Sequence, residues 1–273
     1  MEKDGRVVLV TGASSGIGRA CAEHLATRGW RVYGTSRRPR PDGATPAGVT
    51  MVAMDVDDDR SVADGVRALH AEAGRLDAVV NNAGNAWMGA VEETTMTEAR
   101  AQLETNFFGV LRVCHAVLPI MRAQGHGHIV NVSSLAGVLG LPFSGLYSAS
   151  KFALEGLTES LRHEVRRFGV RVVLVEPGDF ATGLPSARRM TAEAETSAVY
   201  RAAFSAFKAQ QDKDEAGAAT PEPVARLVAR ILDDASPRLR YTVGNLGQRI
   251  VVPLKRYLPQ RLFERVLVLA LGL

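Results

Sequence analysis

The chain has 273 residues, a length that suits one large α/β domain better than two small ones. Hydrophobic residues make up 46% and charged residues 23%, which supports a buried core and argues against a disordered chain. The formal net charge of +4 comes from scattered basic residues without base-reading or RNA-stacking motifs, so it indicates attraction for anionic cofactors or lipid headgroups and argues against nucleic-acid binding.

Segments with the patterns of strands and helices alternate along the chain, which favours a parallel sheet covered by helices on both faces. The predicted strands are residues 6–11, 31–35, 50–54, 76–81, 128–132 and 170–175, with an edge strand at 240–243. The predicted helices are residues 17–28, 61–72, 97–122 and 147–168. We therefore predict a Rossmann-type, doubly wound α/β/α sandwich with three layers.

Three further segments complete the predicted organisation. Residues 38–48 are rich in Pro, Gly and Arg, which is typical of a surface loop. Residues 187–211 have a helical pattern and follow the last central strand, so we predict a lid over about residues 184–215 and a polar linker over 212–223. The chain is interpreted as one domain over residues 1–250, followed by an apolar and basic C-terminal extension over 251–273.

Cysteine usage and the N-terminal residues bear on location. Cys21 and Cys114 show no CxxC or Cys/His spacing, which argues against a metal site and a disulfide framework. The first five residues are polar and the apolar run after them is short, so no signal peptide is predicted. No apolar stretch has the length of a membrane-spanning helix. We expect a cytoplasmic protein, with membrane association left as an alternative for the C-terminal segment.

The first predicted strand runs directly into the turn Thr11-Gly12-Ala13-Ser14-Ser15-Gly16-Ile17-Gly18, and a helix follows. Glycines at such a bend let backbone N–H groups approach a pyrophosphate, which the positive helix N-terminus attracts. The spacing is G-x-x-x-G-x-G, whereas G-x-G-x-x-G is commoner. A tight turn without a ligand is the alternative. The predicted dinucleotide contacts in this turn are Gly12, Ser14, Ser15, Gly16, Ile17 and Gly18.

The end of the second predicted strand indicates which dinucleotide binds. A carboxylate normally stands there, about 20 residues past the glycine-rich turn, and holds the ribose 2′-hydroxyl. This chain has Thr35-Ser36-Arg37-Arg38 and no acid. A guanidinium grips a 2′-phosphate with two hydrogen bonds, whereas a carboxylate repels it. The sequence therefore predicts NADP(H) in preference to NAD(H), with Ser36, Arg37 and Arg38 as contacts. The alternative is that both arginines simply begin a solvated loop.

Three more polar segments are predicted at the carboxyl edge of the same sheet, where open α/β proteins bind ligands. Asn81-Asn82-Ala83-Gly84 follows the fourth predicted strand, and Ser133-Ser134 ends the fifth. Tyr147 and Lys151 are four residues apart on the next predicted helix, so both side chains lie on one face. Each residue alone has an ordinary structural explanation, such as a helix cap or packing, but together they indicate an active site.

The Tyr/Lys pair has a chemical rationale. An unperturbed tyrosine titrates near pH 10, too high for proton transfer at neutral pH. A neighbouring ammonium and the positive charge of an oxidised nicotinamide both favour phenolate and lower the pKa of Tyr147. Ser134 is placed to hydrogen-bond a carbonyl oxygen and stabilise charge that develops there. Asn106 lies inside the predicted helix 97–122, where a merely structural Asn would normally face solvent.

With these motifs in this order, the chain resembles the short-chain dehydrogenase/reductase family in its single-domain branch. The match covers residues 6 to about 185 and rests on Thr11–Gly18, Asp55, Asn81–Gly84, Asn106, Ser134, Tyr147, Lys151 and Pro177-Gly178 with Thr182. Residues 140–156 resemble the 17β-hydroxysteroid and retinol dehydrogenases in particular. Substrate is not carried over from that run, because loops set substrate pockets.

The resemblance implies a catalytic tetrad of Asn106, Ser134, Tyr147 and Lys151. Tyr147 would be the acid/base, Lys151 would hold the nicotinamide ribose and lower the tyrosine pKa, and Asn106 would anchor a water that links Lys151 to solvent. Further cofactor contacts that the resemblance implies are Asp55 at the adenine edge, Val56, Asn82, Ala83, Gly84, Pro177, Gly178 and, at the carboxamide, Thr182. Ser36 replaces the acid of NAD-using members, which again supports NADP.

Apolar residues near this edge are candidates for a substrate pocket. They are Trp87, Met88, Phe143, Phe180 and Leu184, together with the predicted lid. Such a pocket would suit a hydrophobic ketone or alcohol, although the same residues are equally consistent with ordinary core. The predicted activity is NADP(H)-dependent interconversion of a hydrophobic secondary alcohol and a ketone or aldehyde. A non-catalytic NADP(H)-sensing regulator is the alternative, and an epimerase or dehydratase normally needs a longer domain.

Assembly and the C-terminal segment complete the expectations. Apolar residues lie on more than one side of the two long predicted helices, which predicts a homodimer or homotetramer. Examples are Val110, Val113, Val117, Phe152 and Leu161. Residues 253–273 place basic residues and a tyrosine before an apolar run too short to span a bilayer. This segment packs on the protein or on a second subunit, the favoured interpretation, or it makes a peripheral membrane contact.

Overall fold

Seven parallel strands form the central sheet of the computed structural model, which describes residues 5–38, 48–181 and 188–270. The strand order is β3-β2-β1-β4-β6-β7-β9, so the chain winds outward in both directions from β1 and β4. The strands are β1 (Val7–Val10), β2 (Arg31–Ser36), β3 (Thr50–Ala53), β4 (Ala78–Asn81), β6 (Gly127–Val132), β7 (Val170–Pro177) and β9 (Arg240–Val243). The predicted doubly wound fold is confirmed, and so is the edge strand at 240–243.

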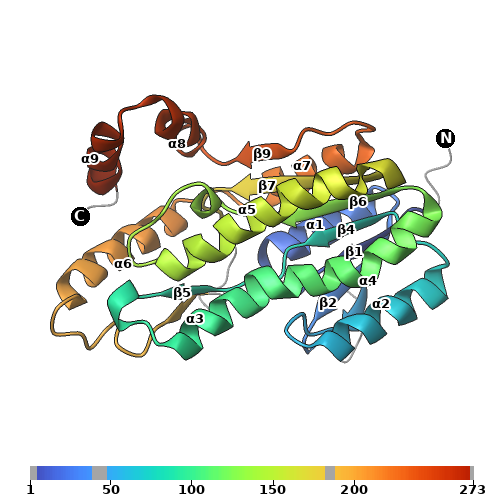
Figure 1. The fold of residues 1–273 in the computed structure, drawn as a ribbon, viewed down its shortest axis with the longest axis horizontal. Helices are drawn as coiled ribbons and strands as arrows, with labels where there is room; N and C mark the ends of the chain where they lie inside the picture. The colour runs from blue at the N-terminus through green and yellow to red at the C-terminus, as the bar shows by residue number, and fades with distance from the viewer. Residues whose placement is uncertain (1–4, 39–47, 182–187, 271–273) are drawn as a thin grey trace.

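Helices cover both faces of this sheet (Figure 1). On one face, α1 (Gly16–Thr27) and α7 (Glu222–Asp233) pack against each other. On the other face lie α2 (Asp59–Ala73), α4 (Gly109–Gln124) and α5 (Gly145–Val165). Alternate residues of β1 point to opposite faces: Val8 and Val10 join the first core and Leu9 joins the second. All β1 residues are buried because both faces of a parallel sheet are covered, which explains their uninterrupted apolar sequence.

The helix predicted over residues 97–122 contains an interruption. It consists of α3 (Met96–Leu103), a π-helical turn η2 (Glu104–Phe108) and α4. A capping box between Thr95 and Glu98 starts α3. The π-helical turn contains Asn106, which is fully buried. A π-helical turn accommodates an extra residue, and such turns often occur at functional sites.

The predicted lid differs from expectation in its first half. Residues 188–190, predicted to be helical, form a short strand β8 (Arg188–Met190) that pairs in parallel with β5 (Ala86–Met88). A helix begins only at α6 (Arg201–Ala216). Three-residue strands show no periodicity, and their pairing joins segments about a hundred residues apart, so the sequence pattern does not reveal them. Residues 184–187 of the lid and most of the predicted loop 38–48 lie outside the described residues.

The predicted boundary after residue 250 falls inside α8 (Leu246–Tyr257). With α9 (Gln260–Ala270), this helix lies at one end of the molecule, outside the layers around the sheet (Figure 1), and we use the term C-terminal extension for α8 and α9 together. None of the helices in the part of the chain that the structure describes is long and apolar enough to cross a membrane.

Most of the residues on which the predicted oligomer was based are buried within the subunit. Val110, Val113, Val117 and Leu161 are buried against the sheet. Phe152 is the exception and stays 43% exposed, with the Lys255 ammonium of α8 at 5.2 Å from its ring centroid. The C-terminal extension thus reaches part of the outer face of α5, and oligomerisation stays a prediction.

Candidate active site

The glycine-rich turn packs tightly against the end of β4. Gly12 has φ +66°, in the left-handed region that favours glycine, and a Cβ there would lie 2.9 Å from the Ala83 Cα. A Cβ on Gly18 would lie 2.3 Å from both the Gly12 carbonyl oxygen and the Asn82 side chain. Any side chain at either position would therefore push the strand ends apart. The first turn of α1 carries no acid, so its N-terminus keeps the positive end that favours an anion.

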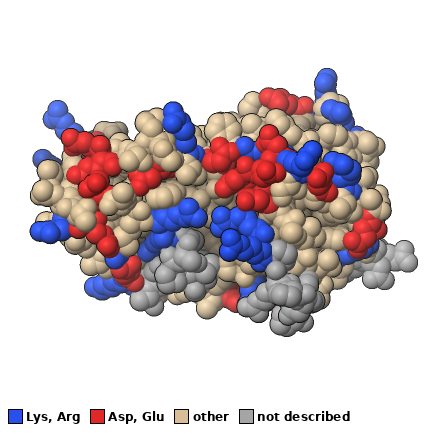
Figure 2. All heavy atoms as spheres, turned by 90° about the horizontal axis from the view of Figure 1, so that it is seen from below, with Lys and Arg blue, Asp and Glu red and all other residues tan. Residues whose placement is uncertain are grey.

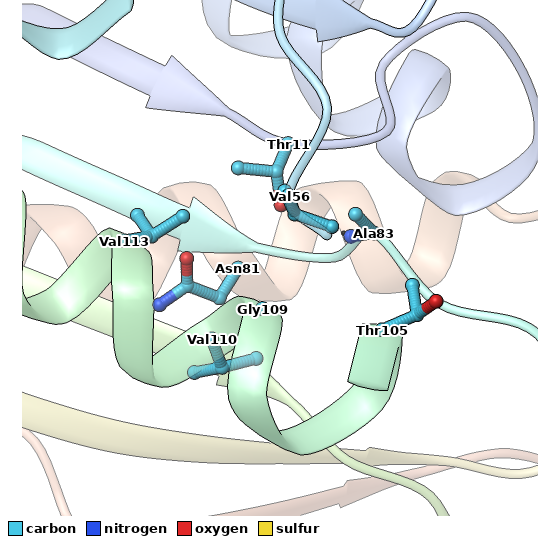
Figure 3. Close-up of a pocket in the computed structure, with 8 residues that line it drawn as sticks. All are labelled: Thr11, Val56, Asn81, Ala83, Thr105, Gly109, Val110 and Val113. Carbon is cyan, nitrogen blue, oxygen red and sulfur yellow. Dashed lines mark hydrogen bonds between the residues drawn. The ribbon is translucent and has the colours of Figure 1, made fainter. Parts of the chain in front are cut away.

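The ends of β1 and β4 are joined by side-chain hydrogen bonds. The Thr11 hydroxyl accepts from the backbone N–H groups of Asn82 and Ala83, each at 3.0 Å. The Asn82 amide donates to the carbonyls of Thr11 at 3.0 Å and Gly12 at 3.3 Å. Figure 3 shows Thr11, Val56 and Ala83 gathered where these strands end. The structure therefore brings the predicted contacts of the turn and of β4 together. Of the remaining turn residues, Ser14 and Ser15 lie between β1 and α1, and Gly16 and Ile17 begin α1.

The predicted adenosine contacts meet at the neighbouring strand ends. Ser36 ends β2, and its hydroxyl accepts from the Arg38 backbone N–H at 3.3 Å. Both Arg37 and Arg38 are exposed. Asp55 follows β3 and accepts from the Asp57 N–H at 3.1 Å. Burial raises the pKa of Asp57 and the Arg37 charge opposes that rise, so Arg37 lies within electrostatic reach of this segment. Basic side chains also gather at the centre of the face drawn in Figure 2.

Ser134 and Tyr147 are in contact. Ser134 follows β6 and caps a short 3-10 turn by accepting from the Ala136 N–H at 3.1 Å. Tyr147 lies in the first turn of α5. Burial raises the pKa of Tyr147, Asp179 adds to that rise, and the hydrogen bond with Ser134 and the Arg188 charge oppose it. The pKa of Tyr147 is therefore raised in the protein itself, where the sequence predicted that Lys151 would lower it, because burial is the largest effect.

Lys151 and Asn106 lie behind this pair. The Lys151 ammonium donates to the Val132 carbonyl at 2.9 Å and lies 5.9 Å from the Tyr147 ring centroid. Burial lowers the pKa of Lys151 to about 8, while the charge of Glu155 opposes that fall. The Asn106 amide donates to the Asn85 carbonyl at 2.9 Å and to the Ser150 hydroxyl at 3.1 Å. All four residues of the predicted tetrad thus lie at one edge of the sheet.

Glu155, one turn along α5 from Lys151, belongs to a buried charge cluster that sequence reasoning missed. Its carboxylate pairs with Arg240 of β9 at 2.9 Å. Arg240 also lies 3.4 Å from the Glu176 carboxylate of β7 and pairs with Glu159. Burial and the nearby Glu176 raise the pKa of Glu155, whereas Ser133 and Arg240 oppose the rise. The cluster places the charge of Glu155 close enough to Lys151 to raise the lysine pKa.

The loop after β7 is covered by α8. Gly178 donates its N–H to the Val243 carbonyl at 2.8 Å, and Pro177 is the last residue of β7. Gln248 of α8 donates to the Asp179 carboxylate at 2.8 Å. A Cβ on Gly178 would lie 2.1 Å from the Gln248 side-chain oxygen, so only glycine allows this approach. Gln248 was not predicted, because nothing local marks it. Thr182 and Leu184 lie outside the described residues.

The predicted pocket residues separate into two groups. Phe143 has T-shaped contacts with Phe204 at 5.7 Å and a tilted contact with Phe207 at 5.6 Å between ring centroids. These three rings, with Met88, form an apolar cluster between β5, α5 and α6. Phe180 instead packs in the core under α1 and α7, so its assignment to the pocket is not supported.

Trp87 lies on β5 next to this cluster. Its backbone N–H donates to the Gln102 side-chain oxygen at 2.7 Å, and the Arg189 guanidinium stands 5.5 Å from its ring centroid. Phe204 and Phe207 were missed, although their spacing of three residues in an otherwise polar helical segment was a usable signal.

Comparison with known proteins agrees with this arrangement. Residues 6–193 match the sequence model described as short chain dehydrogenase. The 3-ketodihydrosphingosine reductase of Bacteroides thetaiotaomicron is 39% identical over 262 residues, which cover 96% of this chain and 96% of that protein. The estradiol 17-beta-dehydrogenase 1 of Rattus norvegicus is 36% identical over 262 residues, which cover 89% of this chain and 74% of that protein. The chain belongs to the short-chain dehydrogenase/reductase family, an oxidoreductase family that binds nicotinamide cofactors.

Solved structures show the same fold. A short-chain dehydrogenase from Streptomyces avermitilis has a TM-score of 0.82 at 37% identity, with 92% of each chain covered. A metagenomic short-chain oxidoreductase in complex with NADP has a TM-score of 0.70 at 30% identity, covering 88% of this chain and 97% of that one. A relative from Burkholderia phymatum in complex with NAD has a TM-score of 0.78 at 28% identity, covering 94% of each. Both dinucleotides occur among these structures, so the fold alone does not select one.

Proposed function

We propose that this protein is an NADP(H)-dependent oxidoreductase that interconverts a hydrophobic secondary alcohol and a ketone or aldehyde. The observation that carries the proposal is the contact between Ser134 and Tyr147 beside the buried Lys151, at the sheet edge that also holds the glycine-rich turn. The turn fits a pyrophosphate, because it runs directly into the N-terminus of α1, whose first turn carries no acid and whose backbone N–H groups attract an anion. When bound there, the nicotinamide supplies or accepts the hydride.

The protein's own residues manage the proton. Tyr147 donates its hydroxyl proton to the substrate oxygen during reduction and takes it back during oxidation. Ser134 donates a hydrogen bond to the same oxygen as charge develops on it. Lys151 holds the nicotinamide ribose, and its ammonium favours phenolate after the proton has left. Because burial raises the pKa of Tyr147, it favours the protonated hydroxyl that acts as the proton donor in reduction.

Asn106 orients the helical turn that carries Tyr147. Its amide binds Ser150, whose hydroxyl donates to the Tyr147 carbonyl at 2.7 Å, so it orients the first turn of α5. We propose that it also anchors the water that connects Lys151 with solvent.

The cofactor preference rests on Ser36, Arg37 and Arg38. Residues 36–38 at the end of β2 include no acid to repel a 2′-phosphate, and the two arginines among them are exposed. Asp55, Val56, Asn82, Ala83 and Gly84 complete the proposed dinucleotide site, with Pro177, Gly178 and Thr182 on the nicotinamide side.

The substrate is proposed to be a long apolar ketone. Phe143, four residues before Tyr147, packs with the buried rings of Phe204 and Phe207 in an apolar cluster, and a relative with 39% identity is a 3-ketodihydrosphingosine reductase. The test is NADPH oxidation with long-chain 3-keto amino alcohols, steroid ketones, retinaldehyde and small aromatic ketones. Turnover of a long-chain substrate supports the proposal. Tight NADPH binding without turnover of any of these would favour the regulatory alternative.

Assembly and location are further parts of the proposal. We expect a homodimer or homotetramer through the outer faces of α4 and α5, where Phe108 and Phe152 are exposed. Sedimentation equilibrium at micromolar concentration tests this, and a monomer would contradict it. The free, buried Cys21 and Cys114 are consistent with a reducing cytoplasmic setting.

A further inference from the structure

Helix α8 presents its apolar stripe outward. Leu246, Ile250 and Tyr257 recur at intervals of four and seven residues, so they lie on one side of the helix. Leu246 is 72% exposed and Ile250 is 43% exposed. A helix on the surface of a water-soluble domain normally buries such a stripe against the core.

The inward side of α8 makes polar contacts instead. Gln248 donates to the Asp179 carboxylate at 2.8 Å, and the Lys255 ammonium donates to the Val138 carbonyl at 2.5 Å. The Lys255 ammonium also stands over the Phe152 ring. These contacts hold the side of α8 opposite the exposed stripe against the protein, together with the half-buried Val251 and Val252.

Helix α9 has an apolar side toward the protein and a second one away from it. Phe263 is buried, and Leu267 packs on the cluster that contains Phe204 and Phe207. The outward stripe is Leu262, Val266 and Leu269, spaced by four and three residues and all exposed. The helices that carry the two stripes, α8 and α9, contact each other outside the layers around the sheet (Figure 1). We call these two stripes the outer face.

Basic residues accompany the outer face. Residues 246–270 contain five Lys and Arg residues and one Glu. By helical spacing, Arg249 lies beside the Leu246–Ile250 stripe, and Arg261 and Arg265 lie on one side of the α9 stripe. All three are exposed. Apolar stripes bordered by cations are typical of helices that lie in the interface of an anionic bilayer.

We propose that α8 and α9 dock this protein on the surface of an anionic lipid bilayer, with the outer face embedded among the lipid headgroups. A second copy of the chain is a poorer occupant, since two such faces would bring like charges together. Docking leaves both helices parallel to the surface, because α8 has 12 residues and α9 has 11, too few to span a bilayer.

The docked face adjoins the proposed substrate site. Leu267 on the inner side of α9 touches the aromatic cluster that contains Phe143, four residues before Tyr147. If the substrate is a long-chain ketone, which rests on the function proposed above, this arrangement brings the pocket next to the membrane in which the substrate is dissolved. Docking itself does not depend on that substrate, so it is measured without substrate and without turnover.

The test is co-sedimentation of the full chain with vesicles of pure phosphatidylcholine and of phosphatidylcholine with phosphatidylglycerol. Binding is expected only to the anionic vesicles, and to fall as salt is raised. The double variant Leu246→Asp with Leu269→Asp should weaken binding at least tenfold. The matched control is Met96→Asp with Val199→Asp, since these residues are 65% and 77% exposed on other parts of the surface. The control should bind like the wild type.

A second set of variants tests the charges. Replacing Arg249, Arg261 and Arg265 by Gln should weaken binding to anionic vesicles about fivefold for each charge removed. The catalytic rate on a small water-soluble ketone should stay unchanged in all of these variants, which shows that they fold. The proposal is overturned if the wild type does not bind anionic vesicles, or if the control pair weakens binding as much as the outer-face pair. It is also overturned if the outer-face pair dissociates an oligomer while no variant affects sedimentation with vesicles.

Discussion

The part of the molecule around β1, β2 and β4 differs in construction from the part formed by β5, β8, α6 and the C-terminal helices. In the first part, backbone meets backbone: Gly12 and Gly18 lie against β4 and the Thr11 hydroxyl joins two strand ends. In the second part, side chains from distant segments make the structure, with a two-stranded sheet and a cluster of aromatic rings. A site built from backbone contacts tolerates few substitutions. A site built from side chains on distant segments can accept a different substrate when those side chains change.

This difference predicts that substitutions in the two parts will affect different constants. Variants in the first part should change the dissociation constant of the cofactor. Variants in the second should change the KM of the organic substrate. Tyr147 lies where the two parts meet, and its substitution should change neither constant strongly.

The largest effect is expected for Tyr147→Phe at that boundary. Removing the hydroxyl removes the proton donor, so kcat should fall by about 10²–10⁴-fold. NADPH affinity should stay near the wild-type value, because the ring and its packing remain. Steady-state kinetics and fluorescence titration with NADPH measure the two quantities. A variant with wild-type kcat on a good substrate would show that the proposed mechanism is wrong.

The next largest effect is expected for Phe207→Ala in the aromatic cluster. Truncating a buried Phe costs about 3–5 kcal/mol of packing. The KM for a long apolar ketone should rise at least tenfold while the NADPH dissociation constant stays unchanged. Phe168→Ala, at the opposite end of α5, is the control: it should lower thermal stability without raising KM. A parallel loss of NADPH binding in Phe207→Ala would remove the distinction between the two parts.

A smaller effect is expected for Arg37→Asp at the end of β2. The substitution replaces a 2′-phosphate partner by a repelling charge, so the NADPH dissociation constant should rise about tenfold, or 1.4 kcal/mol. NADH binding should change far less. Arg230→Asp, an exposed Arg on α7, makes the same charge change away from the site and should leave both constants alone. Equal affinity of the wild type for NADPH and NADH would refute the assignment.

The smallest effect concerns the pH profile of reduction. Burial lowers the pKa of Lys151 to about 8, so its ammonium is lost as the pH rises through 8 and kcat/KM should fall there. The Glu155 charge raises the Lys151 pKa, so Glu155→Gln should move this fall to lower pH by less than one unit. Glu159→Gln is the control, because Glu159 pairs with the same Arg240 but is not among the charges that act on Lys151. An equal shift in both variants would assign the effect to Arg240.

The local features of the candidate site could be predicted from the sequence. The strand, glycine-rich turn and helix over residues 7–27 form one continuous segment, so their spacing alone identifies them. Tyr147 and Lys151 share a helical face because they are four residues apart. The family resemblance added Asn106 and Ser134, which the structure brings to the same sheet edge.

Other features were decided only by tertiary structure. Asn106 is buried in the π-helical segment and donates to the carbonyl of Asn85, twenty-one positions away. Phe180 carries the same apolar character as Phe143, yet packs in the core under α1 and α7 and not in the Phe143 cluster. Likewise, the hydrophobic stripe of α8 looks like that of any buried helix, and only the contacts that the opposite side of α8 makes with the protein show that it faces outward.

The sequence by itself thus determined the fold class, the position of the glycine-rich turn and the Tyr147/Lys151 pair. These depend on periodicity and spacing within about thirty residues of chain, the length of one βαβ unit. The tertiary structure decided the partner of β5, the ring cluster around Phe143, the charge cluster behind Lys151 and the orientation of α8. Each of these joins segments far apart in the chain, and their pairing depends on the packing free energy of the whole domain, which no local pattern contains.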